Sequence, residues 1–211
     1  MSKEKKQKLL AGLRVAMQKD ESLPLREGAT NLVFGDGNPD ADIMFIGEGP
    51  GFWEDKKGIP FVGNAGALLN QFLLAVKIPR EEVFITNVVH FRPPENRDPT
   101  PSELDAFKQY LDKMIAIIKP KIIVTLGRFS MAKFMPGVLI SNVHGKSKTV
   151  NWHGRDIIIL PMYHPAAALR STEIKEKAKR DFQTLPFLLE KSDKTMEEEK
   201  TEKQSEQMNL I

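Results

Sequence analysis

Short apolar runs that alternate with amphipathic segments constrain the fold of this chain more than any other feature. Four runs have the length and composition of buried strands, at residues 43–46, 83–89, 121–126 and 157–161. Helical spacing of apolar residues predicts helices between and around them, at residues 3–18, 66–76, 101–118, 130–134 and 173–189. Strands that alternate with helices form a mostly parallel sheet between helical layers. The sequence therefore predicts a three-layer α/β/α fold.

Composition limits the number of domains and the cellular compartment. At 211 residues and 41% hydrophobic, the chain can bury one core, so we expect one domain over residues 1–190. Residues 191–211 are charged and have no apolar period, so we expect a disordered tail there.

Cysteine is absent, which excludes disulfides, thiolate metal sites and a cysteine nucleophile and fits a reducing cytoplasm. No apolar run approaches the roughly 20 residues of a membrane span. We expect a monomer of the prokaryotic cytosol or nucleoid with no membrane contact. The net charge of +3 permits a polyanionic partner.

Unusual sequence follows three of the four predicted strands, where ligands of open α/β sheets bind. A loop rich in glycine and carboxylates, which starts at Gly47, follows the first strand. Residues 90–97, with two arginines and two prolines, follow the second, and residues 163–170, which include His164 and Arg170, follow the fourth. We expect the three segments to converge on one cleft.

Each of these residues also has a plain structural interpretation. The glycine loop matches neither a phosphate-binding loop nor the dinucleotide fingerprint. Phe61 is either a core residue or a platform for a base, and Asn87 either bridges backbone or reads a carbonyl together with an imide N–H. The position of His164 at a strand end favours a ligand-facing role. His90, His144 and His153 lack metal-like spacing, so we expect them at the surface.

Taken together and in order, the motifs resemble those of the iron–sulfur, family 4 (thermophile-type) uracil-DNA glycosylases. The matching residues are Gly47-Glu48-Gly49-Pro50-Gly51, Glu54-Asp55, Gly58 to Gly63, Ala65-Gly66, Asn87, Arg92-Pro93-Pro94, Asn96-Arg97, His164-Pro165 and Leu169-Arg170. The resemblance covers residues 31–170. It implies a base-excision-repair enzyme that flips uracil out of DNA and hydrolyses its N-glycosidic bond, leaving an abasic site.

The resemblance also implies how the base is held. Phe61 would stack on the flipped uracil, Asn87 would read its polar edge and His164 would contact a carbonyl. Backbone N–H groups of the loop at Gly47 and Gly49 would add donors for the anion that the base becomes when it leaves.

The family's carboxylates fall on Glu48, Glu54 and Asp55. Glu48 is the first candidate to orient water or stabilise the sugar cation, and Glu54 is the second and also binds substrate. The expected phosphate contacts are Arg92, Asn96, Arg97, Arg128, Lys146 and Arg170. Residues 166–169 would enter the groove as a wedge.

The sequence departs from the family at the cluster ligands. The four cysteine positions fall near Asp20, Leu23, Phe91 and Phe107, and none holds a cysteine. We therefore predict no iron–sulfur cluster or other metal, and an apolar plug that includes Phe91 and Phe107 in its place. The exposed-looking pair Phe52-Trp53 stands where acidic residues are common in the family, and it would stack on DNA or pack against the loop.

Three alternatives stay open at this level. A glycosylase of the same fold could act on another deaminated base, such as hypoxanthine or xanthine, although the amide of Asn87 suits a pyrimidine edge. A non-catalytic module could recognise damaged or single-stranded DNA. A cofactor-binding or phosphate-binding α/β protein is the third alternative. The C-terminal tail could recruit a repair or replication partner.

Overall fold

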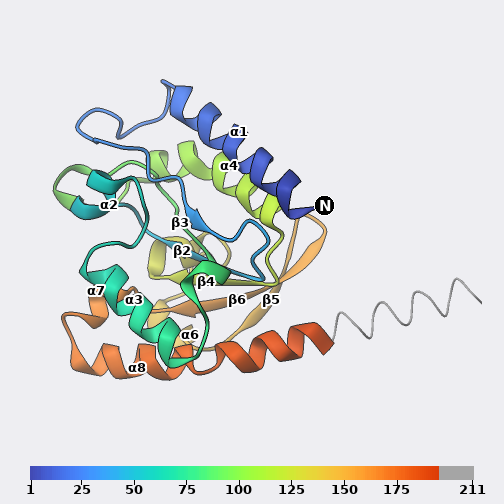
Figure 1. Cartoon of the computed structure of the whole chain (residues 1–211). Helices are drawn as coiled ribbons and strands as arrows, with labels where there is room; N and C mark the ends of the chain where they lie inside the picture. The colour runs from blue at the N-terminus through green and yellow to red at the C-terminus, as the bar shows by residue number, and fades with distance from the viewer. Residues whose placement is uncertain (195–211) are drawn as a thin grey trace, which may run out of the picture.

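A six-stranded sheet lies between two layers of helices in the computed structural model, which describes residues 1–194 (Figure 1). The strands lie in the order β1-β3-β2-β4-β6-β5. Their bounds are Asp36–Gly37 (β1), Ile43–Gly47 (β2), Phe84–Asn87 (β3), Ile122–Leu126 (β4), Lys148–Trp152 (β5) and Arg155–Met162 (β6). The four central strands are parallel, and both edge strands pair antiparallel. The predicted α/β fold with a mostly parallel sheet is confirmed.

The helices divide into two groups by the face of the sheet that they cover. The bounds of the longer ones are Lys3–Lys19 (α1), Asn64–Ala75 (α3), Pro101–Ile118 (α4) and Thr172–Phe182 (α8). The short ones are Phe52–Lys57 (α2), Arg128–Ala132 (α5), Ile140–Val143 (α6), Pro165–Ala168 (α7) and the 3-10 turns Arg80–Glu82 (η1) and Pro94–Asn96 (η2). Apolar side chains of α1, α4 and α5 share one core with the sheet, and those of α3, α7 and α8 share the other.

Alternation within the strands explains why both faces are covered. In β2, Met44 and Ile46 belong to the core under α1 and α4, whereas Ile43 and Phe45 belong to the core under α3 and α8. Successive side chains of a strand point to opposite faces. A central parallel strand therefore needs apolar residues at every position, which produced the continuous runs seen in the sequence.

The two edge strands were not predicted from the sequence. β1 is only two residues long, and β5 alternates exposed and half-buried positions with polar residues. Neither has an apolar run. They are strands because a neighbouring strand offers hydrogen-bonding groups, which is information that the local sequence does not contain.

The C-terminal helix, which we expected over residues 173–189 with a possible kink at Pro186, is interrupted shortly before that proline. A turn at residues 183–184 ends α8, and a second helical segment begins at Leu185, with Pro186 in its first turn. Proline fits there because the first turn of a helix needs no N–H partner. The segment continues through Lys194, and Asp193 pairs with Lys121 at 2.6 Å, so residues 191–194 are ordered although we expected a tail from 191 onward. The rest of the expected tail lies outside the described residues.

None of the described helices is long and apolar enough to cross a membrane.

Candidate active site

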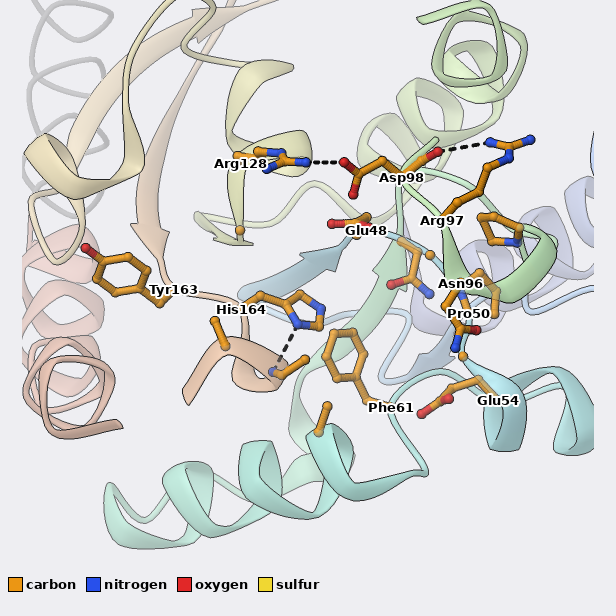
Figure 2. A pocket seen from close by; sticks show the side chains of 18 of the residues that line it. Glu48, Pro50, Glu54, Phe61, Asn96, Arg97, Asp98, Arg128, Tyr163 and His164 are labelled. Atoms are coloured by element: carbon orange, nitrogen blue, oxygen red, sulfur yellow. Dashed lines mark hydrogen bonds and ion pairs between the residues drawn. The ribbon is translucent and has the colours of Figure 1, made fainter. Parts of the chain in front are cut away.

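A pocket of about 570 Å³ opens at the carboxyl ends of β2, β3, β4 and β6. The loops after β2, β3 and β6 all contribute to its lining, as predicted. Figure 2 shows the side chains of Glu48, Phe61 and His164 around this space, and Asn87 also lines it. Three segments distant in sequence meet here because parallel strands present their carboxyl ends at the same edge of the sheet.

Asn87 ends β3 with a side chain that is 1% exposed and lines the pocket. Its Oδ1 atom has no hydrogen-bond partner among the described residues. A buried acceptor without a partner costs about 1–3 kcal/mol. No hydrogen bond of Oδ1 within residues 1–194 supports the alternative that Asn87 bridges backbone atoms.

Gly47 allows the close approach of Asn87 and Phe61. A Cβ atom at Gly47 would lie 2.5 Å from the Asn87 Oδ1 atom and 2.7 Å from the Phe61 ring. Both distances are shorter than a van der Waals contact, so any side chain at position 47 would displace one of these two groups.

The loop that carries Phe61 is held in an unusual backbone conformation. Phe61 has a φ angle of 53°, in the left-handed region that a bulky residue rarely adopts. The Arg80 guanidinium donates to the carbonyl oxygens of Pro60 at 2.7 Å and Phe61 at 3.2 Å. Gly66 lies against the same carbonyl, because a Cβ there would be 1.9 Å from the Phe61 oxygen. These contacts hold the aromatic ring against the pocket, 5.5 Å from the His164 ring.

Glu54 holds the same loop from the other side. Its Oε1 atom accepts hydrogen bonds from the backbone N–H groups of Val62 at 2.9 Å and Gly63 at 2.8 Å. Glu54 lines the pocket, but these bonds direct one carboxylate oxygen to the loop. Asp55 is buried, and its side chain accepts hydrogen bonds from the backbone N–H groups of Thr30 and Asn31. It does not line the pocket, so these bonds serve the fold of the loop.

His164 is the N-cap of α7, and its Nδ1 atom accepts from the Ala166 N–H at 3.1 Å (Figure 2). An acceptor nitrogen carries no proton, so the neutral ring holds its proton on Nε2. Burial lowers the pKa of His164 to about 4, with Glu54 opposing this shift and Arg170 adding to it. At neutral pH the imidazole is therefore an uncharged N–H donor on the wall of the pocket.

Glu48 follows β2 and lines the pocket near an exposed ion pair between Asp98 and Arg128 (Figure 2). Burial raises the pKa of Glu48, the Asp98 carboxylate raises it further and Arg128 lowers it. A carboxyl group with a raised pKa is a stronger base once ionised. The backbone N–H of Val89, beyond the end of β3, donates to the Glu48 carbonyl at 3.1 Å, which fixes the position of Glu48 beyond the end of β2.

The expected phosphate contacts lie in different places. Arg97, Arg128 and Arg170 line the pocket, as does Asn96. Arg97 is held by a bidentate bond to Glu103 at 2.7 and 2.9 Å, and this bond lowers the pKa of Glu103 to about 2.

Two expected phosphate contacts lie outside the lining itself. Arg92 donates to the side chain of Asn96 at 2.9 Å, which places it beside the rim. Lys146 is not part of the lining, and its Nζ donates to the Asn142 carbonyl.

The predicted wedge, residues 166–169, lies partly in the pocket. Ala166 and Ala167 line the pocket, whereas the neighbouring Leu169 is 50% exposed.

None of the positions that correspond to cluster cysteines in the resemblance holds a thiol, and three of the four hold apolar side chains that cannot ligate iron. Leu23, Phe91 and Phe107 are buried in one apolar core, with the two phenyl rings 6.2 Å apart. The Asp20 carboxylate accepts a hydrogen bond from the Tyr110 hydroxyl at 2.6 Å. An iron–sulfur cluster needs thiolates, and no group of three or more metal-ligating side chains occurs in residues 1–194. The donor set does not fit the cluster.

Two histidines are less exposed than we predicted. His90 is fully buried, its Nε2 lies 3.2 Å from the Thr86 hydroxyl, and burial lowers its pKa to about 3. His144 pairs with Asp181 at 2.9 Å. The surface prediction was wrong for these two because spacing in the sequence does not reveal which loop is covered by another element. His153 is exposed, as predicted.

Sequence reasoning missed Arg80, Asp98 and Tyr163 as neighbours or components of the site. Asp98 and Tyr163 line the pocket, and Arg80 acts on the Phe61 loop from η1. Asp98 directly follows the segment 90–97, and Tyr163 begins the segment 163–170, so their positions at strand ends could have indicated them. No local sequence pattern marks Arg80, because it bonds to Phe61 and Pro60, which lie 19 and 20 positions earlier in the chain.

Comparison with known proteins gives a consistent result. A family model described as the uracil DNA glycosylase superfamily matches residues 34–185. The type-4 uracil-DNA glycosylase of Sulfurisphaera tokodaii is 48% identical over 163 residues, which are 74% of this chain and 74% of that protein. The type-4 enzymes of Archaeoglobus fulgidus and Thermotoga maritima are 42% and 41% identical, over 82% and 83% of this chain and 89% and 92% of theirs. The chain belongs to the uracil-DNA glycosylase superfamily.

Proposed function

We propose that the protein removes uracil from DNA by hydrolysing the N-glycosidic bond, which leaves an abasic site for base excision repair. The unpartnered Oδ1 of Asn87, buried in the pocket beside Phe61, is the observation that carries this proposal. The names of the type-4 relatives support the same substrate.

Uracil has an imide N–H between two carbonyls, and Asn87 offers a complementary acceptor and donor. The Oδ1 of Asn87 would accept from the imide N–H, and its amide N–H would donate to a neighbouring carbonyl. Phe61 would stack on the face of the base. Hypoxanthine also presents a carbonyl beside a ring N–H, so a cleavage assay has to distinguish the two bases.

The bond that breaks joins C1′ of the deoxyribose to N1 of the base, and the electron pair leaves with uracil. Negative charge then develops on a carbonyl oxygen, and the Nε2–H of neutral His164 would donate to that oxygen. A preorganised donor of this kind is worth roughly 3 kcal/mol in the transition state. A neutral donor suits the step because it stabilises the anion without transferring a proton to it.

The sugar becomes cationic as the bond breaks, and water must reach C1′. We assign this part of the reaction to Glu48, whose carboxylate would stabilise the cation and orient the water. The hydroxyl of water joins C1′, and the proton that the same water releases neutralises the uracil anion. Glu54 is less suited to the role, because one of its oxygens is occupied by the loop N–H groups.

The base must leave the DNA stack before it can enter the pocket, which costs a few kcal/mol. We propose that Arg92, Arg97 and Arg170, with Asn96, contact the phosphates around the flipped nucleotide, and that residues 166–169 occupy the space that the base leaves. Arg128 becomes available for a phosphate if its exposed pair with Asp98 opens. The reaction as assigned uses no cluster and no metal.

The test is incubation of the purified protein with labelled oligonucleotides that carry uracil, hypoxanthine or thymine, followed by alkali to cut abasic sites. We expect cleavage of the uracil strand alone, and at least about a 100-fold loss of rate in His164→Ala and Glu48→Gln. Cleavage of hypoxanthine instead would transfer the function to another base. DNA binding without cleavage of any substrate would identify a non-catalytic module.

We add proposals for the oligomeric state, the location and the protein partners. We propose a monomer that acts wherever cellular DNA is present, and sedimentation at working concentration tests the oligomeric state. Residues 195–211 lie outside the described part of the chain, and their sequence ends in Met208, Leu210 and Ile211 after a charged stretch. We propose that this end recruits a repair or replication protein. Deletion of residues 195–211 should leave cleavage of free oligonucleotides unchanged and abolish that association.

A further inference from the structure

Two large aromatic side chains are exposed beside the pocket. Phe52 is 45% exposed and Trp53 is 56% exposed, both on α2. Their neighbours in the chain, Gly51 and Glu54, line the pocket. The pair therefore lies at the rim of the site, next to the loop that carries Phe61.

The contacts of this pair fix the indole rather than bury it. The two rings meet edge to face, with centroids 5.2 Å apart at 81°. The indole edge also lies near Gly63, where a Cβ atom would be 3.6 Å from the Trp53 Cδ1 atom. An indole braced on two sides but still more than half exposed presents a preorganised apolar surface to solvent.

Two cations lie near the Phe52 ring of the pair. The Arg92 guanidinium lies over the Phe52 ring, 5.3 Å from its centroid, and the Lys56 ammonium lies 5.8 Å from the same centroid. Arg92 also donates to Asn96, which lines the pocket. Proteins bind single-stranded nucleic acid with aromatic rings that stand beside cations. The bases stack on the rings, and the phosphates of the nucleic acid pair with the cations.

We propose that Trp53 is a stacking platform for an unpaired base of the DNA strand that carries the scissile uracil, braced by Phe52, with Arg92 and Lys56 contacting the adjoining phosphates. The proposal rests on the proposed function, because it places uracil in the neighbouring pocket. A base inside a duplex already stacks on two neighbours, so its face is free for Trp53 only when the strand is single or locally opened. The platform therefore favours uracil in single-stranded DNA.

Binding measurements test the platform without any need for catalysis. Trp53→Ala should weaken binding of a uracil-free single-stranded oligonucleotide by about 5- to 100-fold. It should weaken binding of the matching duplex much less, and Trp53→Phe should restore part of the affinity. Phe187→Ala is the matched control, because Phe187 is 67% exposed on the C-terminal helical segment and lies outside the pocket lining. Its affinity should equal that of the unaltered protein.

Fluorescence gives a second readout that does not depend on folding of the alanine variant. The chain has two tryptophans, so Trp152→Phe leaves Trp53 as the sole indole. Titration of that variant with the single-stranded oligonucleotide should quench its emission. Unchanged emission, or binding by Trp53→Ala within twofold of the unaltered protein, would overturn the platform. Equal losses on single strands and duplex would overturn the single-strand preference.

The uracil cleavage assay separates the two proposals. If Trp53→Ala binds DNA weakly while the unaltered protein cleaves no uracil, the platform stands and the glycosylase function fails. If the unaltered protein cleaves uracil and Trp53→Ala binds single strands normally, the platform alone fails.

Discussion

Replacement of Phe107 by alanine should destabilise the protein strongly without changing its active site. Phe107 is 0% exposed on α4, and its ring packs against those of His90 and Phe91, with centroids 5.6 and 6.2 Å away. Truncation of a buried phenylalanine costs about 3–5 kcal/mol, because the lost transfer free energy adds to the cost of a cavity. In a domain of this size, each kcal/mol lowers the melting temperature by about 2–4 °C. Phe107→Ala should therefore melt about 6–20 °C lower.

Calorimetry or circular dichroism during heating measures this shift, and uracil cleavage is measured well below the lowered melting point. Phe187→Ala is the control, because an exposed phenyl group should change the free energy of unfolding by no more than about 0.5 kcal/mol. Metal analysis of the unaltered protein should find no iron, and chelators should not change its melting temperature. A melting temperature of Phe107→Ala equal to that of the control would refute the apolar plug, and so would stoichiometric iron.

Three further predictions concern the pocket and its supports. Asn87→Asp should lower kcat/KM for uracil cleavage by about 10²–10³-fold, because a carboxylate repels the carbonyl to which the amide donates; activity within a few-fold would remove Asn87 from base recognition. Arg80→Ala should lower kcat/KM by about 10-fold or more while the circular dichroism spectrum stays unchanged, because Phe61 loses the guanidinium that holds its backbone, and Arg80→Lys should restore part of the rate. Acidification from about pH 6.5 to pH 4 should lower the melting temperature, because the folded state keeps His164 neutral with a pKa of about 4 and His90 neutral with a pKa of about 3, while the unfolded chain binds both protons near 6.5. His164→Gln should reduce that slope and leave the part due to His90, and a slope equal to that of the unaltered protein would show that His164 does not contribute to it.

The predicted strands and long helices, apart from the C-terminal helix that is broken at residues 183–184, were found close to their predicted positions because each has a local pattern. All five residues of β4 are buried and four of them are apolar, and α4 begins with a capping box in which Thr100 and Glu103 bond each other's backbone N–H groups. The order of motifs along the chain also sufficed to recognise the family. These features depend on residues that are close together in the chain, so the sequence alone is sufficient to predict them.

The tertiary structure decided the features that depend on contacts between distant residues. Glu54 and Arg80 hold the Phe61 loop from two sides, and neither contact has a signature in the local sequence. The burial of His90 depends on Phe107, which lies 17 positions away in sequence on a different element.

The sequence by itself determined the kind of sheet, the succession of strands and helices along the chain and the strand ends at which polar residues gather. Only the tertiary structure decided which of those polar residues face the pocket and in which state. The pKa of His164 and the missing partner of Asn87 are both consequences of burial. Burial is a property of the packed molecule, because it depends on side chains that approach from every element around the site.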